Sequence, residues 1–272
     1  FIETKIMTDY QTIELEFSDT GIATLWLNRP DKNNAFNAEM INELLQAIDA
    51  VEAEPGVRFM MLRGRGKHFS AGADLGWMRD CAALDYNANL NDARELAQVM
   101  ASLAQLKLPT FAVVHGAAFG GALGLISCCD MAIGSVEATF CLSEVRIGLV
   151  PAVISPYVVQ AMGSRAVRRF ALTAERFHGE RARELGLLAE CYPAAELEDE
   201  LVQWIDRLLQ NGPQAMRATK VLLQEVKNGD MSPPLRRYTE SAIARIRVTP
   251  EGQEGLSAFL EKRDPAWLPK SR

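Results

Sequence analysis

Two glycine-rich segments are the places in this sequence where bare backbone could take part in chemistry. They are His68–Gly76, HFSAGADLG, and Val114–Asp130, VHGAAFGGALGLISCCD. Each follows an apolar run of strand type and could present free N–H groups to a ligand oxygen. Two N–H groups that converge on one oxygen form an oxyanion hole, which stabilises an enolate or a tetrahedral intermediate. The alternative is tight packing of a helix against a strand, and glycine content alone leaves both interpretations open.

Three familiar glycine signatures are absent from the sequence. There is no G-x-x-x-x-G-K-[ST], no Rossmann G-x-G-x-x-G register and no G-x-S-x-G elbow. The sequence therefore argues against nucleotide hydrolysis, dinucleotide binding and α/β-hydrolase chemistry.

Glu144 is the carboxylate best suited to acid–base work. It lies between apolar residues in CLSEVRIGL, shortly before Pro151, so we expect it to be partly buried. Burial raises the pKa of a carboxyl group, which can then hold or give a proton near neutral pH. The alternative is a local ion pair with Arg146. If the segment is a strand, alternation would place these two side chains on the same side.

Composition bounds the class of protein. The chain has 272 residues, 48% of them apolar and 24% charged, which is typical of a globular protein with a sizeable core. Its formal net charge of -6 argues against nonspecific nucleic-acid binding. An odd number of cysteines without C-x-x-C predicts reduced thiols and a cytoplasmic location. The histidines lack ligand spacing, so no metal site is expected.

One long uncharged run, Phe111–Cys129, could imitate a membrane span. Because it contains His115 and is crowded with glycine, we interpret it as a strand, a turn and a buried helix that starts near Phe119 or Gly120. No signal peptide is recognised. The letters FIETKI, residues 1–6, precede Met7 and are expected to be a non-native addition.

The elements that must position these segments alternate between strand and helix in the N-terminal half. Asn37 is expected to cap a helix whose apolar residues recur at a 3.6 period up to Val51. The polar segment 80–92 is expected to be a loop, and a second helix continues to about Leu106. The predicted strands are TIELEF, IATLWLN, VRFMMLRG and TFAVVHG.

Helical patterns dominate after Pro151, which predicts an α/β core followed by a helical C-terminal part. The predicted helices cover residues 158–162, 166–172, 181–185, 197–209, 214–226, 235–248 and 254–262.

Taken together, the motifs resemble the enoyl-CoA hydratase/isomerase superfamily, also called the crotonase superfamily, along nearly the whole chain. The N-terminal matches to family motifs are LNRPDKNNAFNAEM and HFSAGADL. The later matches are HGAAFGGALGLISCCDMAI, FCLSEVRIGLVPA and EGLSAFLEKRDPAW. Their order along the chain also agrees with the family.

The resemblance implies an α/β fold, a crotonase-like ββα superhelix with a helical C-terminal region. Residues 1–200 would form the core, and residues 201–272 would provide helices for trimerisation and CoA contacts. The implied partner is an acyl-CoA thioester, without a metal or redox cofactor and without nucleic acid or membrane. The implied assembly is a homotrimer or a dimer of trimers.

The resemblance also implies roles for single residues. The backbone N–H groups of Ala73 and Gly121 would form the oxyanion hole, and Glu144 matches the second catalytic glutamate of the family. The expected substrate and CoA contacts are Ala71, Asp74 and Leu75 in the CoA channel, Arg29 and Lys32 at its entrance, and Phe259 and Lys262, which could come from a neighbouring subunit.

Gly124 departs from the family pattern. Typical hydratases carry a glutamate there, and two glutamates share the work of hydration. Gly124 could make room for a bulkier substrate or an extra water, and a single glutamate is also the pattern of Δ3,Δ2-enoyl-CoA isomerases. Hydration and isomerisation therefore both remain open.

The combination of motifs resembles bacterial hydratases of branched glutaconyl-CoA thioesters. These act on 3-methylglutaconyl-CoA or isohexenylglutaconyl-CoA in leucine or acyclic-terpene catabolism. A free carboxylate on such a substrate calls for a cation, and Arg146 is the first candidate and Arg79 the second. The third possibility is a non-catalytic RNA-binding or scaffold member of the family, against which the acidic balance and Glu144 argue.

Overall fold

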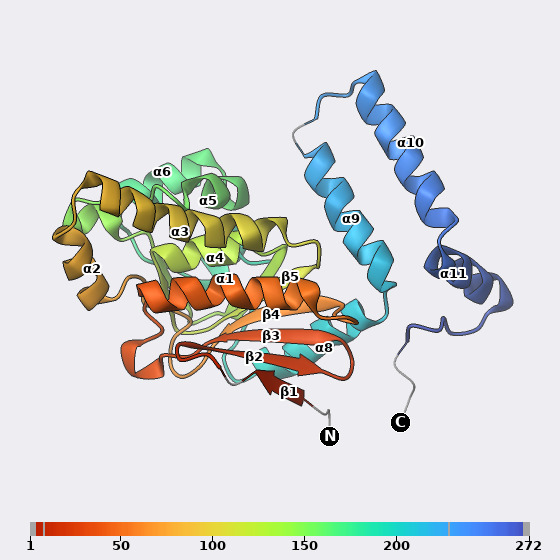
Figure 1. The fold of residues 1–272 in the computed structure, drawn as a ribbon, viewed down its shortest axis with the longest axis horizontal. Helices are drawn as coiled ribbons and strands as arrows, with labels where there is room; N and C mark the ends of the chain where they lie inside the picture. Colours follow the sequence, from red (N-terminus) through yellow and green to blue (C-terminus); the bar gives the residue numbers. More distant parts are fainter. Residues whose placement is uncertain (1–3, 8, 228, 269–272) are drawn as a thin grey trace. The chain divides into compact units, whose positions relative to one another are not determined.

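The computed structural model describes residues 4–7, 9–227 and 229–268 of the chain. By its internal contacts the chain divides into two units (Figure 1). The first comprises the residues up to Leu106 together with Thr110–Glu198, and the second comprises Lys107–Pro109 and the residues from Asp199 onward. The later boundary falls inside α8 (Leu197–Leu209).

The first unit is built on a seven-stranded sheet in the order β1-β2-β3-β4-β5-β7-β10. The two pairings among β1, β2 and β3 are antiparallel and the others are parallel. Its strands are β1 (Thr4–Met7), β2 (Ile13–Ser18), β3 (Ile22–Leu27), β4 (Phe59–Gly64), β5 (Thr110–Val114), β7 (Met131–Ser135) and β10 (Glu190–Tyr192). The four strands predicted from apolar runs are therefore confirmed. Thr4 pairs with Ser18, so the described residues ahead of Met7, from Thr4 on, are part of the sheet.

Helix α1 (Ala38–Ala53) begins where its sequence predicts. The Asn37 side chain accepts a hydrogen bond from the Met40 N–H, at 2.9 Å, and so satisfies one of the free donors of the first turn. Its apolar stripe, which includes Leu44 and Val51, is buried. Figure 1 shows α1 beside α3 (Tyr86–Gln105), which it contacts.

The prediction that residues 80–92 form a loop is wrong. α2 (Leu75–Ala82) and the start of α3 occupy most of that segment. Asp85 caps α3 by accepting a hydrogen bond from the Ala88 N–H, at 2.9 Å. The helical residues of this segment are exposed or half-buried. The segment is therefore polar because its helices face solvent, and not because it is a loop.

A small second sheet, in the order β6-β8-β9, lies in the same unit. β6 (Ala117–Phe119) is parallel to β8 (Thr139–Cys141), and β8 is antiparallel to β9 (Phe177–His178). Strands of two or three residues carry no readable alternation, which is why the sequence did not predict them. The short helix α4 (Gly121–Cys128) follows β6, and the 3-10 helix η2 (Glu144–Ile147) follows β8.

The remaining helices of the first unit agree with the helical pattern after Pro151. They are α5 (Ser155–Met162), α6 (Ser164–Thr173) and α7 (Gly179–Glu184). An additional 3-10 turn, η1 (Pro30–Lys32), precedes α1. The fold class is thus mixed α/β, as the sequence predicts.

The second unit is helical. It contains α9 (Pro213–Val226), α10 (Pro233–Arg247) and α11 (Pro250–Glu261), which contact one another. The Glu251 carboxylate of α11 accepts hydrogen bonds from the N–H groups of Gln214 and Ala215, at 2.9 and 2.8 Å. An acidic side chain thereby satisfies the first donors of α9, where the helix dipole also favours it.

Candidate active site

The two glycine-rich segments lie side by side in the first unit. Ser70 and Ala118 form a parallel bridge. The Ser70 N–H donates to the Ala117 carbonyl and the Phe119 N–H donates to the Ser70 carbonyl, both at 3.0 Å. Ser70 is fully buried. The backbone bonds of the first segment are therefore made with the second, which fixes the register between the two.

The N–H group of Ala73 is oriented by a second parallel bridge, with Phe36. The Phe36 N–H donates to the Gly72 carbonyl at 2.7 Å, and the Asp74 N–H donates to the Phe36 carbonyl at 2.8 Å. In a parallel ladder, Phe36 bonds to the carbonyl of the residue before Ala73 and to the N–H of the residue after it. The N–H of Ala73 therefore points away from Phe36. No acceptor for that N–H is found in the described part of the chain.

Gly121 contributes the other candidate donor. It is the first residue of α4, so its N–H has no partner within the helix, and the described residues offer it no other acceptor. A Cβ at Gly121 would lie 2.9 Å from Cε2 of Phe36. Phe36 therefore contacts Gly121 with its ring and pairs with Ala73 through its backbone, which brings both N–H groups into one cluster.

Glu144 lies beside these donors because β6 and β8 are paired. The Gly120 N–H donates to the Cys141 carbonyl at 2.9 Å, and η2 begins three residues later. Gly120 adopts φ +55° and ψ -121°, a conformation for which glycine is suited. A Cβ on Gly120 would lie 3.2 Å from Oε1 of Glu144. A side chain at this position would press on the carboxylate.

The burial and the raised pKa of the Glu144 carboxyl group suit a residue that takes up and releases protons. Its Oε2 atom is buried and has no hydrogen-bond partner among the residues that the structure describes. Burial raises the pKa of Glu144 above its ordinary value, against a smaller lowering by a backbone hydrogen bond. A carboxyl group with a raised pKa and a free oxygen can bind a water molecule or take a proton from it.

The alternative of a local Glu144–Arg146 pair is wrong. The segment is a 3-10 helix and not a strand, so side-chain alternation does not apply. The Arg146 guanidinium donates instead to the Ala174 carbonyl, at 2.9 Å. Arg79, the second candidate for binding a substrate carboxylate, lies exposed in the last turn of α2.

The two cations expected at the CoA entrance differ in their surroundings. Arg29 is largely buried and donates to the Ala35 carbonyl, at 2.6 Å, and to Oδ2 of Asp74, at 3.2 Å. Lys32 is exposed at the end of η1. The side chain of Asp74 also caps α2, and these backbone hydrogen bonds, with Arg29, lower the pKa of its carboxyl group.

The space at Gly124 is already filled, which corrects the expectation of room for water or a bulkier acyl group. A Cβ there would lie 2.3 Å from Cγ2 of Ile154 and 3.0 Å from Cε of Met100. Gly124, Ile154 and Met100 are all buried. At the position where typical hydratases carry the other catalytic glutamate, this chain thus has an apolar contact between α4 and Ile154, the residue that precedes α5.

The other predicted contacts are distributed over both units. The Ala71 N–H donates to the Asn33 carbonyl at 2.9 Å, and Leu75 is 78% exposed at the start of α2. Phe259 and Lys262 belong to the second unit. Phe259 is 82% exposed, and Lys262 ends α11 in a left-handed conformation. Their role toward CoA stays a prediction.

Sequence reasoning missed three residues that organise the site. Phe36 links the two N–H donors, as described above. The buried side chain of Asn34 donates to the carbonyls of Arg65 and His68, both at 2.8 Å. The Ser70 hydroxyl donates to the Asn34 carbonyl, also at 2.8 Å. The available signal for Asn34 and Phe36 was a short polar and aromatic run, NNAFN, without helical or strand periodicity, and Ser70 lies in the first glycine-rich segment.

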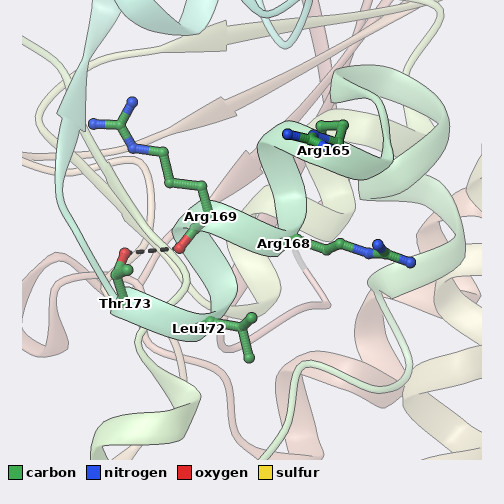
Figure 2. Close-up of a pocket in the computed structure, with 5 residues that line it drawn as sticks. All are labelled: Arg165, Arg168, Arg169, Leu172 and Thr173. Atoms are coloured by element: carbon green, nitrogen blue, oxygen red, sulfur yellow. Dashed lines mark hydrogen bonds between the residues drawn. The ribbon is translucent and has the colours of Figure 1, made fainter.

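A separate surface pocket lies on α6. Figure 2 shows its lining residues and the hydrogen bond from the Thr173 hydroxyl to the Arg169 carbonyl, which is 2.7 Å long. Arg168 and Arg169 point in different directions from the helix (Figure 2). The pocket is lined by Arg165, Arg168, Arg169, Leu172 and Thr173. It offers no carboxylate and no pair of free N–H groups, so the acid–base chemistry is assigned to the Glu144 cluster.

The described residues also bear on metal binding and on a membrane span. No group of three or more histidine, cysteine, aspartate or glutamate side chains there could hold a metal ion. No helix in that part of the chain is both long and apolar enough to cross a membrane.

Comparison with known proteins agrees with the arrangement of the site. The family model "Enoyl-CoA hydratase/isomerase" matches residues 18–270. The crystal structure of an enoyl-CoA hydratase from Shewanella pealeana is 47% identical, with a TM-score of 0.91, and the match covers 95% of this chain and 97% of that one.

Two curated relatives have different named substrates. Hydroxycinnamoyl-CoA hydratase-lyase of Pseudomonas fluorescens is 33% identical, over 93% of this chain and 94% of its own. The 2,3-dehydroadipyl-CoA hydratase of Escherichia coli is 28% identical, over 90% of this chain and 94% of its own. Because these relatives differ in the acyl group they are named for, the likeness alone does not select a substrate.

Proposed function

Because this chain belongs to the enoyl-CoA hydratase/isomerase family, we propose that it hydrates a branched glutaconyl-CoA thioester. The enzyme is of the hydro-lyase type, and the substrate would be 3-methylglutaconyl-CoA or isohexenylglutaconyl-CoA, in leucine or acyclic-terpene catabolism. The observation that carries the reaction type is the buried Oε2 of Glu144, near the N–H groups of Ala73 and Gly121. Within the described part of the chain, none of these three groups has a hydrogen-bond partner.

The proposed reaction begins with polarisation of the thioester. The carbonyl oxygen accepts hydrogen bonds from the N–H groups of Ala73 and Gly121. Attack at the β-carbon moves negative charge onto this oxygen, and donors fixed in advance stabilise the resulting enolate more than they stabilise the substrate. Gly121 also directs the positive end of α4 toward the same oxygen, which adds to the stabilisation.

A single carboxylate is sufficient for the proton balance. Glu144 accepts one proton from water as the water oxygen bonds to the β-carbon of the substrate. The enolate then takes a proton from the protonated Glu144 at its α-carbon, and the carboxylate is restored. The net change is one H and one OH across the double bond. A raised pKa suits both halves of this cycle, because the same group must take and return the proton.

In this proposal the thioester carries CoA as part of the substrate, and no metal or redox cofactor takes part. Arg146 remains the first candidate to bind the substrate carboxylate, because one donated bond to Ala174 leaves other guanidinium donors for a second acceptor. The E. coli relative is named for a dicarboxylic acyl-CoA, which supports a substrate of this class.

Assembly and location belong to the same proposal. We expect a homotrimer or a dimer of trimers in the cytoplasm. The large apolar side chains exposed in the second unit, including Val248, Phe259 and Leu260, support association with another subunit.

An isomerase is the second candidate, and the Gly124 contact is what favours it. With Ile154 and Met100 in place of a second carboxylate, Glu144 is the glutamate that remains to carry a proton. A Δ3,Δ2-enoyl-CoA isomerase would use it to move one proton between two carbons, without adding water.

The substrate proposal is tested by comparing kcat/KM for 3-methylglutaconyl-CoA and 3-methylcrotonyl-CoA, which lacks the free carboxylate. A charged hydrogen bond contributes roughly 1.5–3 kcal/mol, so we expect a preference of about 10- to 100-fold for the glutaconyl thioester. Arg146→Ala should remove most of this preference, whereas Arg181→Ala on the exposed surface of α7 should keep it. Equal values for both substrates in the wild type would overturn the proposal.

A further inference from the structure

We propose that Arg29 and Asp74 form a clasp that positions the N–H group of Ala73, and that Arg29 is not a ligand of the CoA phosphates. The clasp consists of the Arg29 guanidinium, the Asp74 carboxylate and the Ala35 carbonyl. This inference rests on the proposed function, because it concerns the donor that would bind the thioester oxygen.

The contacts of Arg29 lie at both ends of the short backbone pairing that orients Ala73. Nη1 donates to the carbonyl of Ala35, the residue before Phe36, and Nη2 donates to the carboxylate of Asp74, the residue after Ala73. The Phe36–Ala73 bridge lies between these two anchor points. One guanidinium therefore joins the two strands of the pairing from the side, with planar fork geometry suited to two acceptors.

The burial of the pair fits a positioning role. The exposed fractions of the two side chains are 16% for Arg29 and 18% for Asp74. Asp74 also accepts hydrogen bonds from the N–H groups of Gly76 and Trp77, at 2.8 and 3.2 Å. The carboxylate thus connects Arg29 with the start of α2, and its own residue directly follows Ala73.

The same contacts argue against a phosphate ligand. The carboxylate of Asp74 lies against the guanidinium and offsets its charge, and it would repel an approaching phosphate. Lys32 provides a contrast, because it is exposed and no ion pair or hydrogen bond of its side chain is found among the described residues. If a cation near this loop binds the CoA phosphates, Lys32 is better placed electrostatically than Arg29.

A positioning residue and a phosphate ligand make opposite predictions for a substrate without phosphates. We would measure kcat and KM for wild type, Arg29→Ala and Arg29→Lys with a CoA thioester and with the N-acetylcysteamine thioester of the same acid. Displacing a fixed donor weakens the stabilisation of the enolate. The clasp therefore predicts that Arg29→Ala lowers kcat about 10- to 100-fold with both substrates.

Two variants separate positioning from a loss of folding. Asn is as good a helix cap as Asp, so Asp74→Asn should keep α2 capped while it removes the charge that holds Arg29. We expect it to reproduce the loss in kcat of Arg29→Ala at a melting temperature close to that of wild type. Arg29→Lys should recover part of kcat. Arg181→Ala, which removes an exposed ion pair with Glu184, is the matched control and should leave kcat unchanged.

The infrared frequency of the bound thioester carbonyl gives a test that does not depend on turnover. The infrared band of a bound thioester labelled with ¹³C at its carbonyl falls in frequency when the carbonyl is polarised. We expect a smaller fall in Arg29→Ala and Asp74→Asn than in wild type and Arg181→Ala. The clasp would be overturned if Arg29→Ala raised KM for the CoA thioester, left KM for the N-acetylcysteamine thioester unchanged and did not lower kcat. It would also be overturned if the carbonyl band in Arg29→Ala and Asp74→Asn were the same as in wild type. If wild type converts neither thioester, the proposed function fails, while the carbonyl comparison still decides the clasp.

Discussion

Gly120 and Glu144 are in contact through the carboxylate, because a Cβ built on Gly120 would lie 3.2 Å from Oε1 of Glu144. Backbone pairing fixes this relationship, since the Gly120 N–H bonds to the Cys141 carbonyl, three residues before Glu144. The glycine therefore has two functions. It accommodates a backbone with φ +55°, and it leaves the carboxylate free of a neighbouring side chain.

The first prediction concerns Gly120→Ala. The new methyl group presses on the carboxylate and the backbone is strained, so we expect kcat to fall at least 10-fold and stability to fall by about 1–3 kcal/mol. Gly56→Ala is the matched control, because Gly56 also has a positive φ, +83°, but its Cβ would meet nothing within 4 Å. It should lose stability and keep kcat. Equal losses of kcat in both variants would contradict the contact with Glu144.

The second prediction is the pH dependence of catalysis. As the proposed base, Glu144 must be ionised in the free enzyme, and burial raises its pKa above the ordinary 4.5. The value of kcat/KM should therefore fall as pH is lowered through this raised pKa, with a midpoint above 4.5. A pH–rate profile with a stable substrate measures it. An acid limb with its midpoint at or below 4.5 would show that a different group limits the reaction.

The third prediction is that Glu144→Gln is more stable than wild type at neutral pH. The folded-state pKa of Glu144 is raised, so ionisation favours the unfolded chain. This destabilisation is absent below the unfolded pKa of about 4.5, grows as pH rises toward the folded pKa, and is constant above it. Urea unfolding at pH 4 and pH 7.5 should show a gain in stability for the variant at pH 7.5 only. A gain of the same size at both values would contradict the assignment.

The fourth prediction concerns the apolar contact at Gly124. Gly124→Ala places a methyl group against Ile154, so we expect a loss of about 1–3 kcal/mol in stability. Ile154→Ala leaves a cavity and should also destabilise the protein. Because one change makes space for the other, the double variant should lose less than the sum of the two single losses. Additive losses, measured by chemical unfolding, would show that the two sites do not interact.

Much of the fold and the general location of the site were predictable from the sequence. The N-terminal helix was marked by Asn37 and a regular apolar stripe, and the strands were marked by dense apolar runs. The segment of residues 80–92 could not be assigned in this way, because an exposed helix and a loop have similar polar composition. Strands as short as β6 and β8 have no periodicity to read.

The site was predictable in its residue types but not in its contacts. The sequence indicated Glu144 as a carboxylate in apolar surroundings, and burial of Oε2 agrees with this. It could not show that Arg146 binds the Ala174 carbonyl, because residue 174 comes from another element. It also could not show that Ile154 fills the space beside Gly124. Such contacts depend on tertiary packing, which local sequence patterns do not contain.

The central claim is that Glu144 alone moves the proton during hydration. The direct test is to incubate wild type and Glu144→Gln with 3-methylglutaconyl-CoA in H₂¹⁸O and to analyse the products by mass spectrometry. The account predicts one labelled water in the wild-type product and a rate about 10²- to 10⁴-fold lower in the variant, with CoA binding retained. Labelled product at an undiminished rate in the variant would contradict the claim. So would a wild-type product that carries no label and has only a shifted double bond.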